Sequence, residues 1–171
     1  LPERLVVAAT LDTPLGPMLG AATDAGVCLL EFLDRRMLPT QLAILERRVG
    51  HVVPGRHAYL ERVQAELDEY FAGRRRDFSV PLVAPGSLFE HAVWDELRRI
   101  PSGETRSYDA LAAALGRPGA ARAVGRSNGR NRLTIIIPCH RVIGANGALT
   151  GYGGGLWRKQ ALLDLEAAPL A

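Results

Sequence analysis

A stretch that contains Pro81 and Pro85 divides the sequence into two parts with different patterns. Proline lacks a backbone N–H and restricts the residue before it, so residues 80–86 are not expected to continue a helix or an inner strand. Short β-type runs open the part before this stretch, whereas apolar residues at helical spacing dominate the part after it. The sequence therefore predicts an N-terminal domain over residues 1–84 and a C-terminal domain over residues 85–171.

The N-terminal part combines three β-type runs with two helical patterns. The runs cover residues 5–11, 18–23 and 26–33, and turn residues separate them. Residues 37–48 and 57–71 place apolar side chains at helical spacing. This order predicts an α+β domain in which helices pack on an antiparallel sheet.

The C-terminal part is predicted to be mainly helical. Ser87 is a suitable N-cap for a helix that ends near Pro101. Two short helices at 107–115 and 120–128 are joined by a four-residue turn with two glycines, a pattern that fits a helix-turn-helix. The β-branched run at 133–137 is expected to be a buried strand, and a last helix is expected at 156–166.

Composition and charge restrict the class of protein. Hydrophobic residues make up 47% and charged residues 23%, as in folded globular proteins, and no apolar run is long enough to cross a membrane. The first residues show no signal or transit peptide pattern. Two cysteines without paired spacing favour a reducing compartment, so a cytoplasmic location is expected. The net charge of +3 allows a polyanionic partner without requiring one.

Cys139 is the candidate nucleophile, since it follows a buried run and directly precedes His140 and Arg141. A cysteine needs a nearby base or positive charge to become a thiolate near neutral pH, and these two neighbours offer both. A buried structural cysteine is the commoner alternative, and it suits Cys28, whose neighbours are apolar. The histidines show no metal-ligand spacing with the cysteines, so neither a metal nor a cofactor is expected.

The second helix of the helix-turn-helix lies in a basic segment. Its first residues, 120–125, are small apart from Arg122, so they offer few groups that read base edges. Small residues and arginines instead favour close approach to the DNA backbone, although many helical hairpins bind nothing. The arginines in and around this helix are Arg117, Arg122, Arg126, Arg130 and Arg132.

Three motifs together resemble those of the O6-alkylguanine-DNA alkyltransferases. They are residues 136–144, which contain Pro-Cys-His-Arg, residues 103–108 and residues 120–125. The resemblance covers residues 89–166, whereas the N-terminal part agrees only in size and in its ribonuclease H-like outline. Residues 29–38 are similar to versions fused behind an AraC-type regulator, as in Ada proteins. With the absent initial Met, this favours a fragment of a longer protein.

The resemblance implies direct-reversal DNA repair, in which an alkyl group moves irreversibly from guanine O6 to the Cys139 thiolate. The nucleotide is flipped out of the duplex first, because the target atom lies inside it. His140 is then the base, acting through a water and oriented by Glu166. Tyr108 donates toward guanine N3, and Asn131 braces the turn that carries Cys139.

The resemblance also implies DNA contacts and a pocket for the alkylated base. Arg122 enters the base stack in place of the flipped nucleotide, and the glycine run 153–155 favours an open, mobile pocket wall. Double-stranded DNA with O6-alkylguanine is the expected partner of a monomer. The predicted DNA contacts are Arg122, Ala121, Ala123, Gly125 and Arg141. The predicted pocket residues are Val142, Tyr152, Gly153 and Lys159.

Two other functions stay open at this point. A DNA-binding module that recognises alkylated bases without chemistry would lack the cysteine, whereas Cys139 is present. A cysteine hydrolase would need an oxyanion hole and a separate His-Asn pair, and no recognisable spacing for that pair occurs.

Overall fold

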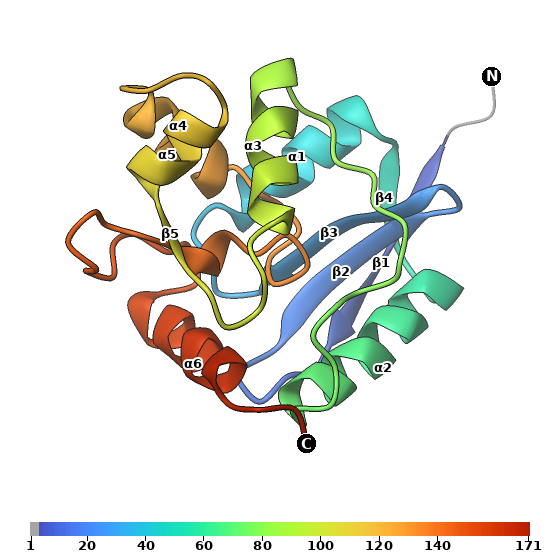
Figure 1. Cartoon of the computed structure of the whole chain (residues 1–171). Helices are drawn as coiled ribbons and strands as arrows, with labels where there is room; N and C mark the ends of the chain where they lie inside the picture. The colour runs from blue at the N-terminus through green and yellow to red at the C-terminus, as the bar shows by residue number, and fades with distance from the viewer. Residues whose placement is uncertain (1–3) are drawn as a thin grey trace. The chain divides into compact units, whose positions relative to one another are not determined.

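The computed structural model describes residues 4–171, which form two compact units. Of the described residues, 4–85 and 170–171 form unit 1, and Gly86–Pro169 form unit 2. Each unit has its own secondary structure and is described by itself (Figure 1).

Unit 1 contains a four-stranded sheet. Its strands are β1 (Leu5–Leu11), β2 (Met18–Thr23), β3 (Gly26–Phe32) and β4 (His51–Pro54), in the order β3-β2-β1-β4. The predicted antiparallel pairing holds for β1–β2 and β2–β3, but β4 lies parallel to β1. β4 was not predicted from the sequence, because it has only four residues and ends in a proline. The sheet is therefore mixed, within the α+β fold that was predicted.

The two helices of unit 1 cover opposite faces of this sheet (Figure 1). Ala21 of β2 belongs to a core cluster with Leu45 of α1 (Leu38–Arg48). The preceding residue, Gly20, faces Leu60 of α2 (Ala58–Phe71), because a Cβ at Gly20 would lie 3.0 Å from Leu60 Cδ2. Successive residues of a strand point to opposite faces, so α1 and α2 enclose the sheet between them.

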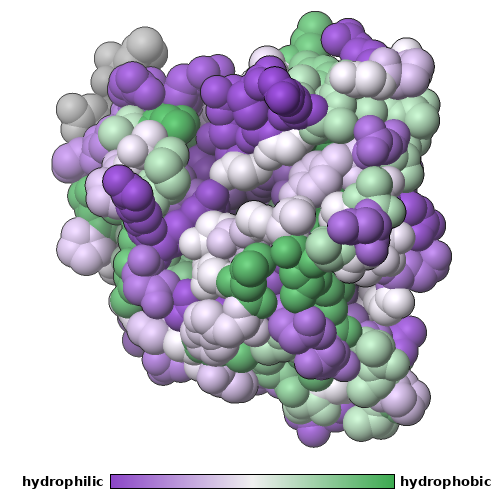
Figure 2. Space-filling view, turned by 90° about the vertical axis from the view of Figure 1, so that its left-hand side faces the viewer, coloured by the Kyte–Doolittle hydropathy of each residue, from purple (hydrophilic) through white to green (hydrophobic). Residues whose placement is uncertain are grey.

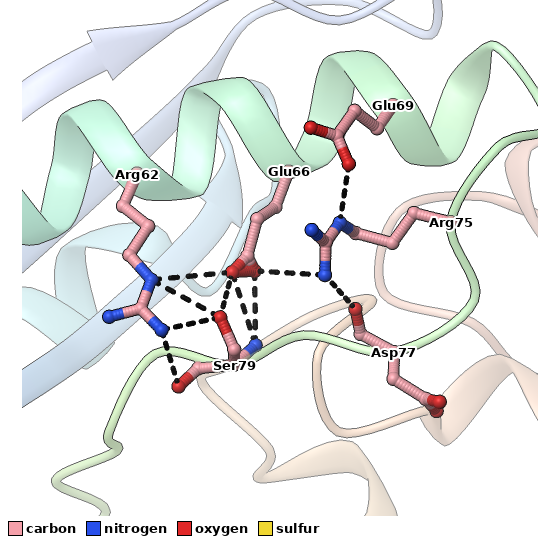
Figure 3. A network of polar contacts seen from close by, with 6 residues as sticks. All are labelled: Arg62, Glu66, Glu69, Arg75, Asp77 and Ser79. Atoms are coloured by element: carbon pink, nitrogen blue, oxygen red, sulfur yellow. Dashed lines mark hydrogen bonds and ion pairs between the residues drawn. The ribbon is translucent and has the colours of Figure 1, made fainter.

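A buried carboxylate fastens the segment after α2 back onto that helix (Figure 3). Glu66 accepts hydrogen bonds from the amide and the hydroxyl of Ser79 and lies 3.6 Å from Arg62 Nε and 4.0 Å from Arg75 Nη1. Arg75 also binds Glu69 and the carbonyl of Asp77. We call Glu66, Ser79, Arg62 and Arg75 the Glu66 network. It provides hydrogen-bond partners for backbone and side-chain groups in a segment without regular structure.

Unit 2 is mainly helical, as predicted. Ser87 and Ser107 cap α3 and α4, because their hydroxyl oxygens accept hydrogen bonds from the amides of Glu90 and Ala110. Trp94 of α3 donates its indole N–H to the carbonyl of Ser127 in α5, which joins these helices. The elements are α3 (Leu88–Arg98), β5 (Arg106–Ser107), α4 (Tyr108–Ala114), α5 (Ala121–Gly129), the 3₁₀ helix η1 (Cys139–Arg141), β6 (Val142–Ile143) and α6 (Leu156–Ala167).

The prediction of a strand at residues 133–137 is wrong. The amide of Ile137 donates to the carbonyl of Leu133, and Ile135 has a φ of 74°, so the chain turns back instead of extending. Its β-branched residues are all buried, and burial rather than an extended backbone explains their apolar character. A short parallel pair, β5–β6, was not predicted either.

Polar and apolar residues are interspersed on the face drawn in Figure 2, where hydrophilic residues surround smaller hydrophobic groups. Exposed large apolar side chains include Leu88, Leu156 and Trp157. Among residues 4–171, no helix combines the length and the apolar character that a membrane crossing requires.

Candidate active site

A buried turn in unit 2 presents Cys139 at the start of η1. Asn131 holds this turn from both sides, because its Nδ2 donates to the carbonyl of Ile137 at 2.8 Å and its Oδ1 accepts from the amide of Leu133 at 2.9 Å. Asn128 also donates to the Cys139 carbonyl, at 3.4 Å. Hydrogen bonds to the carbonyls of Ile137 and Cys139 therefore fix the backbone that carries the Cys139 side chain.

The side chains of the next two residues, His140 and Arg141, both bind the carboxylate of Glu166 in α6. His140 is fully buried, and its Nε2 lies 2.8 Å from Glu166 Oε2. Arg141 binds the same carboxylate in a bidentate manner, at 2.8 Å through Nε and 3.0 Å through Nη2, and its Nη1 donates to the carbonyl of Ile100. Two residues of η1 are thereby locked onto the end of α6.

The electrostatics of this group define which nitrogen is basic. Burial alone would raise the pKa of Glu166, but hydrogen bonds and charges from His140 and Arg141 lower it to about 2. Burial lowers the pKa of His140, against the opposing effect of Glu166. The carboxylate is therefore ionised and the imidazole neutral near pH 7, so Nε2 carries the proton that Glu166 accepts. His140 Nδ1 keeps its lone pair, and no described protein group binds it.

Lys159 brings a positive charge to the same place. Its side chain is buried, and its Nζ donates to the carbonyl of Thr150 at 2.7 Å. Burial lowers the pKa of Lys159, while the negative charge of a Cys139 thiolate raises it. By reciprocity, the ammonium stabilises the thiolate of Cys139, which is what a nucleophilic cysteine requires.

The predicted pocket residues Val142, Tyr152 and Gly153 lie in β6 and in the segment before α6. Val142 is buried in β6, Tyr152 is half-buried and Gly153 is exposed. Tyr108 is the first residue of α4, and its hydroxyl accepts a hydrogen bond from Thr150 Oγ1 at 3.5 Å. The Tyr108 ring faces Gly125 of α5, where a Cβ would lie 3.7 Å from the ring.

The helix-turn-helix places its cations on the outside. Arg122 and Arg126 of α5 are exposed, and neither has a carboxylate within ion-pair distance among the described residues. Arg130 lies 3.7 Å from Glu90, and the Arg117 guanidinium packs over the Phe89 ring. Ala121 and Ala123 are half-buried small residues on the same helix. A surface of exposed arginines and small residues is better suited to binding the phosphates of a polyanion than to specific contacts with base edges.

One placement differs from the role expected from sequence, one agrees with it, and one contacting residue was missed. Arg141 is buried in its pair with Glu166, which argues against the predicted DNA contact. Cys28 is buried in β3 beside the carbonyl of Ala21, in agreement with a structural cysteine. Asn128 was missed, because nothing in the local sequence indicates that its amide reaches the Cys139 carbonyl. Within residues 4–171, no cluster of three or more His, Cys, Asp or Glu could hold a metal.

Both units match known families. Residues 6–84 match the ribonuclease-like domain of 6-O-methylguanine DNA methyltransferase. Residues 88–168 match the DNA-binding domain of 6-O-methylguanine DNA methyltransferase.

Similar proteins and solved structures extend over nearly the whole chain. A methylated-DNA–protein-cysteine methyltransferase of Mycobacterium leprae is 46% identical, covering 92% of this chain and 90% of that protein. A constitutive one of Bacillus subtilis is 43% identical, covering 92% and 93%. The crystal structure of Mycobacterium tuberculosis OGT in complex with DNA has 44% identity and a TM-score of 0.82, covering 96% of this chain and 95% of that one.

Proposed function

Because the chain belongs to the 6-O-methylguanine DNA methyltransferase family, we propose that it repairs DNA by moving a methyl or small alkyl group from guanine O6 to Cys139. The observation that carries this proposal is the buried Glu166–His140 pair. It leaves Nδ1 as the basic atom in the residue next to a cysteine, while Lys159 favours the thiolate. The site therefore contains a nucleophile, its base and a charge that stabilises it.

The transfer is a single displacement at the alkyl carbon. The Cys139 thiol gives its proton to His140 Nδ1 through a water, since adjacent residues do not readily bring these atoms into direct contact. The thiolate then forms an S–C bond as the C–O6 bond breaks. Tyr108 donates its hydroxyl proton to guanine N3, and the imidazolium restores that proton. The enzyme ends as an S-alkylcysteine and acts once.

DNA binding is assigned to the helix-turn-helix of unit 2. The sequence of this unit contains eleven Arg or Lys and seven Asp or Glu, whereas unit 1 contains ten and eleven. The exposed arginines of α5 would neutralise phosphates of a duplex, and Arg122 would occupy the place of the flipped nucleotide. Little preference for a particular unmodified sequence is expected from the alanines and glycine of this helix.

The proposed protein acts as a monomer, because Cys139, His140, Glu166 and Lys159 all belong to unit 2 of one chain. Both cysteines are present as thiols, which supports a cytoplasmic location. The fusion to an AraC-type regulator stays a prediction from sequence.

Substitution of the two cysteines tests the proposal. Cys139→Ala and Cys139→Ser are expected to abolish transfer from O6-methylguanine in duplex DNA, while binding of that DNA is retained. Cys28→Ala is the matched control and should transfer at the normal rate. The measurement is the loss of O6-methylguanine from the oligonucleotide. Transfer by Cys139→Ala, or label on the Cys28 peptide, would overturn the assignment.

A further inference from the structure

Two consecutive residues of α6 hold the segment that precedes this helix. We call residues 150–155 the glycine loop, because Gly151, Gly153, Gly154 and Gly155 lie in it. Lys159 Nζ donates to the carbonyl of Thr150 at 2.7 Å, and Arg158 Nη1 donates to the carbonyl of Gly154 at 3.1 Å. The glycine loop is thus fastened near both of its ends, although its composition alone suggests a mobile wall.

Trp157 lies against the same end of the glycine loop. Gly155 has a φ of +95°, and a Cβ there would lie 3.1 Å from Trp157 Cδ1 and 3.2 Å from Nε1. The indole therefore packs on the backbone of Gly155, where a side chain would be both crowded and strained. The Arg158 guanidinium lies over the ring, with Cζ 4.7 Å from the ring centroid.

The burial of these two neighbours is unequal. Trp157 remains 59% exposed, whereas Arg158 is only 4% exposed. An exposed tryptophan without contacts would be an ordinary surface residue. Here its ring is fixed on one side by the buried guanidinium of Arg158, which also binds the glycine loop. The ring and the loop are therefore held together.

We propose that Trp157 and Arg158 are specificity-determining residues that hold the glycine loop as a fixed wall of the alkyl pocket. This inference rests on the proposed function and on the prediction from sequence that Tyr152 and Gly153 line that pocket. Glycines lose more conformational freedom than other residues when they are ordered, so a run of them keeps one shape only if other groups hold it. Releasing the wall lets it retreat and admits a larger O6 substituent, whereas the small methyl group gains nothing.

The test compares two substrates in the same duplex, one with O6-methylguanine and one with O6-benzylguanine. For Trp157→Ala, the ratio of the benzyl rate to the methyl rate under single-turnover conditions should rise roughly two- to fivefold. Trp157→Phe keeps a ring over Gly155 and should leave the ratio near that of the unchanged protein. Leu156→Ala is the matched control, since Leu156 is also a large, exposed apolar residue at the start of α6.

Arg158→Met gives an independent variant, because it keeps an apolar stem but removes the hydrogen bond to Gly154. Amide hydrogen exchange of residues 153–155 should become faster in Trp157→Ala and Arg158→Met and remain unchanged in Leu156→Ala. This second measurement does not depend on activity. Failure of the unchanged protein to transfer methyl would refute the proposed function, whereas unchanged exchange would refute the loop anchoring alone. An equal fall of both rates at a constant ratio would refute the role in specificity.

Discussion

Unit 1 and unit 2 each contain a buried carboxylate that pairs with at least one arginine. Glu66 in unit 1 binds Ser79 and lies within ion-pair distance of Arg62 and Arg75 (Figure 3). Glu166 in unit 2 binds Arg141 and His140. By burial and by charge the two sites are alike, since both glutamates are almost inaccessible to solvent.

The difference lies in what the partners are able to do. The partners of Glu66 are arginines, a hydroxyl and a backbone amide, none of which exchanges a proton near neutral pH. Glu166 binds a histidine, and this interaction fixes the tautomer that leaves Nδ1 basic in the residue adjacent to Cys139. A buried carboxylate with arginines is thus a stabilising element in unit 1. In unit 2, the histidine and the cysteine make a similar arrangement part of the chemistry.

The largest expected effect concerns stability. Glu66→Ala should lower the free energy of unfolding by about 4 kcal/mol, because two hydrogen bonds to the carboxylate and two ion pairs are lost. The transfer rate of the molecules that remain folded should not change. Chemical denaturation and single-turnover kinetics measure the two quantities. A slower transfer step in folded Glu66→Ala protein would contradict a purely structural role for the Glu66 network.

The dependence of stability on pH should come in part from Glu166. Its pKa of about 2 in the folded protein lies below the ordinary value of 4.5, so it stabilises the fold above pH 4.5. This contribution, about 3 kcal/mol, is lost as the pH falls from 4.5 toward 2. His140, whose pKa is also lowered, adds a loss of the same sign below its ordinary value of 6.5. Denaturation curves at several pH values should show a shallower decline for Glu166→Gln, and an unaltered decline would refute this contribution.

The smallest of the three effects, when all are expressed as free energies, concerns the rate of alkyl transfer. Glu166→Gln keeps the shape of the side chain but no longer fixes the His140 tautomer by charge. Transfer should slow roughly 100-fold, which corresponds to about 2.7 kcal/mol. Glu66→Gln is the matched control and should transfer within about twofold of the unchanged protein. Equal slowing by both substitutions would remove the distinction between the two carboxylates.

Local signals predicted much of the secondary structure. Ser87 and Ser107 precede helix-forming residues, and both cap helices in the structure. β4 escaped prediction because four residues carry too little periodicity to be distinguished from a loop. The run at 133–137 was misassigned, because apolar β-branched residues indicate burial, and burial is compatible with a turn.

Residue patterns alone predicted only the local part of the candidate site, and the role of Glu166 came from the resemblance to a known family. Pro-Cys-His-Arg is contiguous, so Cys139 and His140 were found directly from the sequence. Arg141 and Glu166 are 25 residues apart, and no local pattern shows that they pair. The anchoring of the glycine loop by Trp157 and Arg158 was hidden for another reason. It depends on backbone carbonyls and on a positive φ, which side-chain patterns do not encode.

The most direct test of the central claim is mass spectrometry of the protein after incubation with duplex DNA that contains O6-methylguanine. The account predicts that each active molecule gains the mass of one methylene, that the gain maps to the peptide with Cys139, and that it persists. Turnover of the substrate without a stable gain in mass, or a gain on any other residue, would contradict it.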